Sequence, residues 1–213
     1  MRYNFFSFLI AAIYARYYAI YEEQMRYDPI TEKPYCCVPA VLQMIQARRG
    51  LSSMSQDEIG WQLGLIVPPE VKSEFTRVRT GPRPRTGYGT QTSNPQFSIE
   101  NYFVRNHLPL SITRVAASSP VELNSIVGAA LDRDDDLMLC LNSLHLFGDG
   151  DLEHVLLIEA FNSASGQVTV VDPAIGAPMH RITTVESIFE TILAHNVSAL
   201  GGLWIISERG PDA

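Results

Sequence analysis

The sequence has little of what several protein classes require. Only three of its 213 residues are cysteines, and Cys36 and Cys37 are adjacent, so a disulfide framework is excluded. No run of about 20 apolar residues occurs, which excludes an ordinary membrane-spanning helix. Internal repeats and low-complexity tracts are absent. Cysteine and histidine do not cluster at the close spacing typical of zinc sites, and we expect neither a metal nor an organic cofactor.

Basic residues are also in deficit. There are 16 lysines and arginines against 23 aspartates and glutamates, a net charge of -7. Such a chain does not attract phosphate backbones or anionic lipid, so we expect no nucleic acid partner and no stable membrane insertion. With 46% hydrophobic and 18% charged residues, the composition is that of a folded globular protein. The length favours a single domain over residues 1–213.

The apolar segment at residues 1–22 has three interpretations. Its core from Phe5 to Ala15 has the length of a signal-peptide core, but Ile13 fits the cleavage position poorly and Arg16 ends the run. We therefore expect a packed N-terminal helix, with a strand and a targeting segment as alternatives. A cytoplasmic location follows from the first interpretation and secretion from the last.

Residues 39–49 form the clearest predicted helix. Pro39 suits the first helical turn, and Gly50 suits the position after the last turn. The apolar residues recur at the spacing of one helix face: Val38, Val41, Leu42 and Ile45.

Three further helices are predicted, over residues 53–63, 96–107 and 118–131. The first has a capping box of Ser55 and Glu58, and the third has a cap at Ser119 before Pro120. The second has an apolar side formed by Phe97, Ile99, Phe103 and Val104. Between the first two of these helices, residues 68–95 are rich in glycine and proline and predict a long surface loop.

The last third of the chain changes to short apolar runs. Strands are predicted over residues 137–141, 154–161, 167–171 and 202–207. Helices at the front and antiparallel strands at the back indicate an α+β fold.

Cys37 stands at the start of the best predicted helix. The positive end of the helix dipole and the free N–H groups there stabilise a thiolate, so we expect a lowered thiol pKa and a nucleophilic sulfur. A buried structural thiol is the alternative.

His154 opens an apolar strand, and Asp172 ends the next one. If residues 162–166 form the hairpin loop, Phe161 faces Gln167, and His154 and Asp172 lie one diagonal step apart on the same sheet face. A slip of two residues places them directly opposite. Either register lets the carboxylate orient the imidazole, so Cys37, His154 and Asp172 supply a nucleophile, a base and an orienting group.

The helix opening and the hairpin resemble those of a known family. YCCVPAVLQM, through Cys37, Pro39, Ala40, Leu42 and Met44, is similar to the Cys-Gly-Pro-Ala opening of papain-like cysteine peptidases, particularly those that process bacteriocin leaders of the double-glycine type. The segment from His154 to Asp172, Pro173 and Gly176 resembles their His and Asp-Pro segments, and TGYGTQ resembles the middle of that family. The resemblance covers roughly residues 20–195.

The resemblance implies a papain-like fold and cysteine-dependent hydrolysis of a peptide or amide bond in a peptide or protein substrate. Acyl transfer or glutamine deamidation by the same residues is an alternative, as is a non-catalytic peptide-binding relative. The family places an oxyanion-hole glutamine about six residues before the cysteine, where this chain has Thr31, and it has glycine where this chain has Val38. Cys36 directly precedes Cys37 and is the alternative nucleophile, although the alignment of Pro39 and Ala40 favours Cys37. Gln24 is then the candidate for the oxyanion contact.

Overall fold

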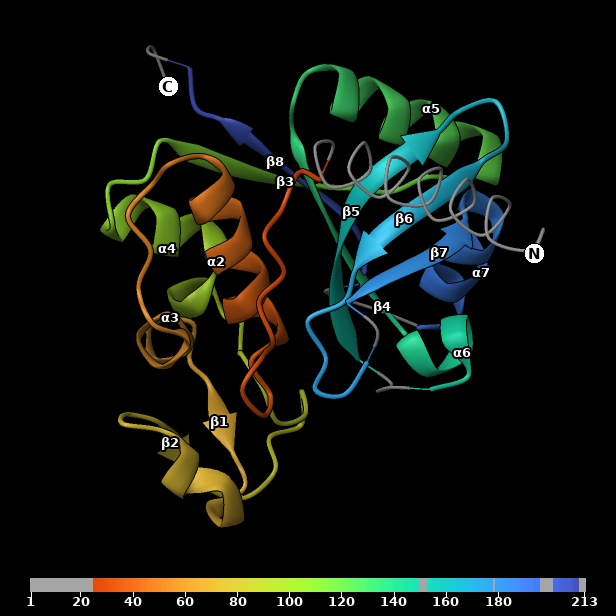
Figure 1. Ribbon diagram of the computed structural model, residues 1–213. Coiled ribbons are helices and arrows are strands. Elements are labelled where there is room, and N and C mark those ends of the chain that lie inside the picture. The colour runs from red at the N-terminus through yellow and green to blue at the C-terminus, as the bar shows by residue number, and fades with distance from the viewer. Residues whose placement is uncertain (1–24, 150–152, 178, 196–200, 211–213) are drawn as a thin grey trace, which may run out of the picture.

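A six-stranded antiparallel sheet forms the centre of the molecule, with helices on both of its faces (Figure 1). The structure is a computed structural model that describes residues 25–149, 153–177, 179–195 and 201–210. The predicted segment 1–22 and Gln24 lie outside these residues. The strand order is β3-β8-β4-β5-β6-β7, and every neighbouring pair is antiparallel. The predicted α+β class is confirmed.

The strands of this sheet are β3 Leu110–Val115, β4 Asp136–Leu141, β5 His154–Asn162, β6 Gln167–Val171, β7 His180–Thr184 and β8 Gly202–Glu208. The helices are α2 Cys37–Arg48, α3 Gln56–Gln62, α4 Ile99–Arg105, α5 Pro120–Asp132, α6 Ser143–Phe147 and α7 Val185–Ala194. Among the described residues, no helix is both long and apolar enough to cross a membrane.

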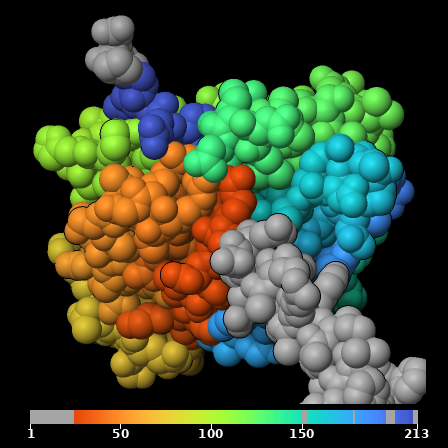
Figure 2. Space-filling view, turned by 45° about the horizontal axis from the view of Figure 1, so that its top comes forward, coloured from red at the N-terminus to blue at the C-terminus, as the bar shows by residue number. Residues whose placement is uncertain are grey.

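Alternation along the strands gives the sheet two apolar cores. On β4, Met138 joins the core shared with α2, α3 and α4, whereas Leu137 and Leu139 join the core shared with α5 and α7. The first core places the N-terminal helices against the sheet. In the space-filling view this N-terminal part, red to orange, lies on one side of the molecule, and the β5–β7 region, cyan to blue, lies on the other (Figure 2).

Local sequence signals placed the N-terminal helices correctly. The apolar residues predicted to form one face of α2 are all buried, and Gly50 after its end has the left-handed φ of 62° that glycine adopts without strain. Ser55 and Glu58 form the predicted capping box of α3, and Ser119 caps α5. In α4, however, Val104 is half exposed, and Tyr102 takes the buried position beside Phe103.

The predicted loop at residues 68–95 is more ordered than its composition indicated. It contains the 3-10 helix η1 Pro69–Glu74 and the strand β2 Arg79–Thr80, which pairs in parallel with β1 Ile66–Val67. The guanidinium groups of Arg77 and Arg79 lie 3.9 and 3.8 Å from the ring centre of Trp61 in α3. These cation–π contacts attach the segment to the helical half.

A β-bulge at Glu159 changes the register of the β5–β6 hairpin. Asn162 pairs with Gln167, one residue away from the predicted pairing, but the extra residue restores the predicted register at Leu157 and Val171. Asp172, which follows β6, is therefore in phase with His154 on the same sheet face. Without the bulge, the one-residue difference would turn Asp172 to the opposite face.

The buried carboxylate of Asp136 fixes the C-terminal end of α2 to the sheet. Asp136 begins β4 and is fully buried. It accepts hydrogen bonds from Arg48 Nη1 at 3.0 Å, from Arg49 Nε, and from the Tyr27 hydroxyl at 2.7 Å. A buried charge is tolerated where several donors surround it in this way.

We expect Asp136→Asn to lower the free energy of unfolding by about 3 kcal/mol, because two largely buried arginines lose their anionic partner. The measurement is urea denaturation at neutral pH. Asp134→Asn is the matched control, since Asp134 also pairs with Arg48 but its side chain is 76% exposed. Its cost should stay below about 1 kcal/mol. Equal effects of the two substitutions would contradict the role of Asp136.

Candidate active site

Cys37 is the first residue of α2 and lies at the wall of a cavity. The chain turns into the helix through Tyr35, whose φ of 64° is unusual for a residue other than glycine, and through a hydrogen bond from the Cys36 N–H to the Lys33 carbonyl. The turn sends the two cysteines in different directions. Cys36 is completely buried in a small cluster with Leu65 and Val67, whereas Cys37 stays partly exposed.

His154 and Asp172 form a buried hydrogen-bonded pair. His154 Nε2 lies 2.8 Å from Asp172 Oδ1, and each side chain is only 2% exposed. Asp172 Oδ1 also accepts the Ala174 N–H at 2.9 Å, and Oδ2 accepts Arg181 Nη1 at 3.2 Å. Burial alone would raise the pKa of Asp172, but the contacts with His154, Ala174 and Arg181 outweigh it and lower the pKa. The carboxylate is thus ionised and oriented.

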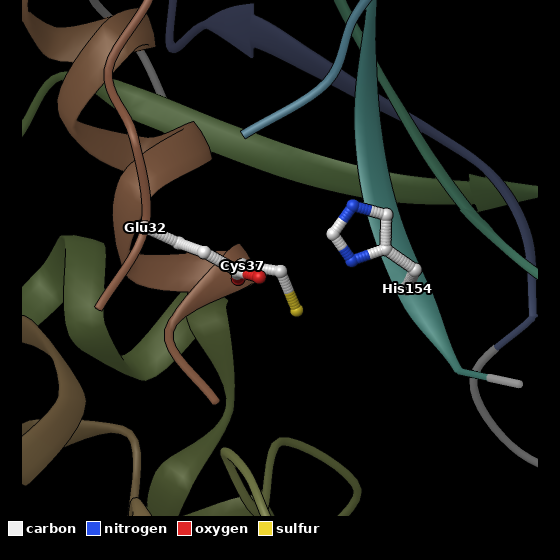
Figure 3. Close-up of side chains that lie close together, drawn as sticks. All are labelled: Glu32, Cys37 and His154. Carbon is white, nitrogen blue, oxygen red and sulfur yellow. The ribbon is translucent and has the colours of Figure 1, made fainter. Parts of the chain in front are cut away.

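The structure brings Cys37 and His154 together from opposite parts of the chain (Figure 3). The Cys37 sulfur, a ring nitrogen of His154 and a carboxylate oxygen of Glu32 all lie within 4.8 Å of one another. Because Nε2 of His154 is hydrogen-bonded to Asp172, Nδ1 is the ring nitrogen on the side of the sulfur (Figure 3). The imidazole therefore lies between a carboxylate and a thiol, as proton transfer from the thiol requires.

Glu32 is the residue that sequence reasoning missed. Its backbone N–H donates to the carbonyl of Pro173 at 2.8 Å, directly after Asp172. On either side of Glu32, the Gln56 side chain accepts from the Lys33 N–H at 2.7 Å and donates to the Thr31 carbonyl at 3.0 Å. These three hydrogen bonds fix the backbone that carries the acid. The only signal in the sequence was its position five residues before Cys37, close to where the family has glutamine.

The predicted lowering of the Cys37 pKa is wrong. Burial raises the pKa of this thiol well above its ordinary value, and the charge of Glu32 raises it further. A hydrogen bond from the Val38 backbone at the helix N-terminus lowers it, but this contribution is smaller than that of burial. Burial and the neighbouring carboxylate of Glu32 therefore both disfavour the thiolate form of Cys37.

The cavity in front of Cys37 and His154 has a volume of about 230 Å³ and is bounded by both halves of the molecule. The helical half contributes Val38 and Ile99, and the sheet contributes Met138, Val155 and Trp204. The end of the 68–95 segment supplies a third wall, formed by Thr86, Tyr88, Gly89, Thr90 and Thr92. The cavity thus combines a largely apolar floor with a polar rim.

No protein-family model and no curated protein matches the sequence. Among solved structures, the peptidase domain of Streptococcus ComA, a bi-functional ABC transporter involved in a quorum-sensing pathway, aligns with 86% of this chain and 99% of its own length. The sequence identity is 13% and the TM-score is 0.48, which describes a distant likeness of shape.

We expect Glu32→Gln to lower the pKa of the Cys37 thiol, because the substitution removes a neighbouring negative charge while keeping the side-chain shape. The pH at which iodoacetamide alkylates Cys37 at half its maximal rate should fall. Peptide-resolved mass spectrometry measures this rate for each cysteine separately.

Glu153→Gln is the control for this measurement. Burial, and after it the charge of Glu153, raises the pKa of Cys140, whereas Glu153 is not among the main causes of the Cys37 shift. This substitution should leave the Cys37 profile in place. An unchanged Cys37 profile in Glu32→Gln would contradict the electrostatic contact.

Proposed function

We propose that the protein is a cysteine-dependent hydrolase of peptide or amide bonds. The observation that supports this function best is the joint placement of Cys37, His154 and Asp172. A thiol at a helix N-terminus, an imidazole beside it and a buried carboxylate behind that imidazole meet at one cavity. These are the three groups that nucleophilic catalysis by a thiol requires.

His154 acts as a general base during attack. Because burial and Glu32 disfavour a free thiolate, the thiol proton passes to His154 Nδ1 as the sulfur bonds to the substrate carbonyl carbon. Asp172 keeps the ring in the required tautomer through Nε2–H and stabilises the imidazolium. The imidazolium then protonates the leaving amine as the C–N bond breaks, which leaves a thioester on Cys37. Water, deprotonated by His154, attacks the thioester and releases the acid.

The negative oxygen of the tetrahedral intermediates needs hydrogen-bond donors. The backbone N–H of Cys37, at the helix N-terminus, is one proposed donor. Gln24 remains the proposed side-chain donor. If an amine replaces water in the second step, the same thioester gives acyl transfer, and a side-chain amide as substrate gives glutamine deamidation.

One observation favours a second function, a peptide-binding protein without catalysis. The carboxylate of Glu32 lies beside Cys37 and raises the pKa of its thiol, which opposes both thiolate formation and a developing oxyanion. The cavity and its apolar floor would serve a bound peptide equally well.

The test compares single cysteine variants on a mixture of peptides from digested cellular protein, with new peptide termini identified by mass spectrometry. Cys37→Ala should lower cleavage by roughly 10⁴-fold or more, because the nucleophile is lost. Cys36→Ala should retain cleavage, because Cys36 is buried in a separate apolar cluster.

Absence of cleavage by the unaltered protein, together with saturable peptide binding, would establish the second function instead. Cleavage that survives Cys37→Ala would refute the proposed nucleophile.

A further inference from the structure

We infer that Glu32, Cys37 and His154 form a binding site for a zinc ion that blocks the nucleophile. The three side chains come from separate parts of the chain, so no local spacing indicated the site in the sequence. Their ligand atoms, a carboxylate oxygen, a sulfur and a ring nitrogen, lie within 4.8 Å of one another (Figure 3).

The geometry is close to that of a zinc site. Tetrahedral zinc holds sulfur at about 2.3 Å and nitrogen or oxygen at about 2.0 Å, which separates the ligand atoms by roughly 3.3–3.6 Å. The ligand atoms therefore need to approach one another by up to roughly 1.5 Å, a movement that rotation about side-chain bonds supplies. Thiolate and imidazole select zinc over calcium or magnesium, which prefer oxygen ligands.

The groups behind these ligands match those behind metal-binding histidines. Such a histidine usually donates its second N–H to a carboxylate, which fixes the ring and makes the other nitrogen a better ligand. Asp172 holds Nε2 of His154 in this way and is itself held by Ala174 and Arg181. Nδ1 is then directed to the metal position.

The backbone of Glu32 is also fixed before any metal binds. Its backbone N–H is bonded to Pro173, and Gln56 is bonded to the backbone of the residues on either side. A ligand whose backbone is fixed loses little conformational freedom when the metal binds. Cys37 and His154 both line the cavity, so the fourth zinc position opens toward it. A water molecule there would complete a site with three protein ligands.

Zinc binding and hydrolysis exclude each other. The metal bonds to the Cys37 sulfur, whose proton is released to solvent, and to the nitrogen that would accept that proton during attack. The blocking of catalysis rests on the proposed hydrolase function, whereas the zinc site itself rests only on the arrangement of the three ligands.

The test begins with zinc titration of the full chain against a fluorescent chelator, without any peptide. The unaltered protein should bind one zinc ion per chain at this site. Glu32→Gln should weaken zinc binding by at least about tenfold, and Cys37→Ser, which removes the thiolate, by at least about 100-fold. Both substitutions are nearly isosteric, so the fold should be retained.

Two control variants make the same types of substitution at cavity residues that lie outside the proposed ligand set. Cys140→Ser removes another thiol of the cavity wall, and Glu153→Gln removes another carboxylate of that wall. Both should bind zinc as the unaltered protein does. If Glu32→Gln binds as tightly as the unaltered protein, or if a control variant loses the same affinity, the zinc site is refuted.

Cobalt provides a second readout of the ligands. Co²⁺ bound by the unaltered protein should give the intense sulfur-to-cobalt absorption of a thiolate ligand, and Cys37→Ser should lose it while Cys140→Ser keeps it. Retention of this absorption in Cys37→Ser would overturn the assignment of the sulfur ligand.

Peptide cleavage is then measured with zinc and after a chelator removes it. Zinc should abolish cleavage reversibly. A protein that binds zinc through these ligands but cleaves nothing would refute the hydrolase and support the zinc site, whereas a protein that cleaves peptides but fails the titration would refute the zinc site alone.

Discussion

The position of Cys37 depends on how α2 is fixed to the sheet, and the buried carboxylate of Asp136 fixes it. With 12 residues, α2 extends about 18 Å from its anchored end to Cys37. β4 begins at the same Asp136 and ends at Leu141, which pairs with His154. β4 therefore connects the carboxylate that holds α2 to the position that pairs with His154. The same strand in this way positions both Cys37 and His154. A helix attached only by apolar packing could slide along its axis, but directional hydrogen bonds to a buried charge prevent this movement.

The parts of the fold that the sequence predicted are those with strong local signals. α3 and α5 carry side-chain caps, α2 has an apolar face between Pro39 and Gly50, and the central strands β4, β5, β6 and β8 are mostly apolar. In the six-stranded sheet, the two missed strands are the edges, β3 and β7, and most of their residues are only partly buried or exposed. An edge strand needs few apolar residues, so its pattern differs little from that of a loop. α7, also missed, packs against α5, α6, β4 and β7.

The site was predictable where it rested on residue types and not where it rested on geometry. The pairing of His154 with Asp172 followed from strand alternation, although the bulge at Glu159 that preserves the alternation left no mark in the sequence. Glu159, the residue at the bulge, is buried, and its carboxylate accepts a hydrogen bond from the Arg26 backbone N–H. Glu32 was not predicted because the family pattern has an amide, not an acid, near this position. The pKa of Cys37 was misjudged because burial and a neighbouring charge depend on tertiary contacts that a helix start does not reveal.

In the 68–95 segment, the residues that attach the segment to α3 differ from most of those that face the cavity. Arg77 and Arg79 tether the segment to Trp61, and a two-way backbone pairing of Gly89 with Ile66 closes its far end. Gly89 both faces the cavity and forms this pairing, whereas the cavity-facing side chains of Thr90 and Thr92 take no part in these anchoring contacts. Related chains can therefore exchange those side chains, and with them the preference for a bound molecule, while the scaffold keeps its stability. Diversification of this wall would be expected to proceed faster than change at either anchoring point.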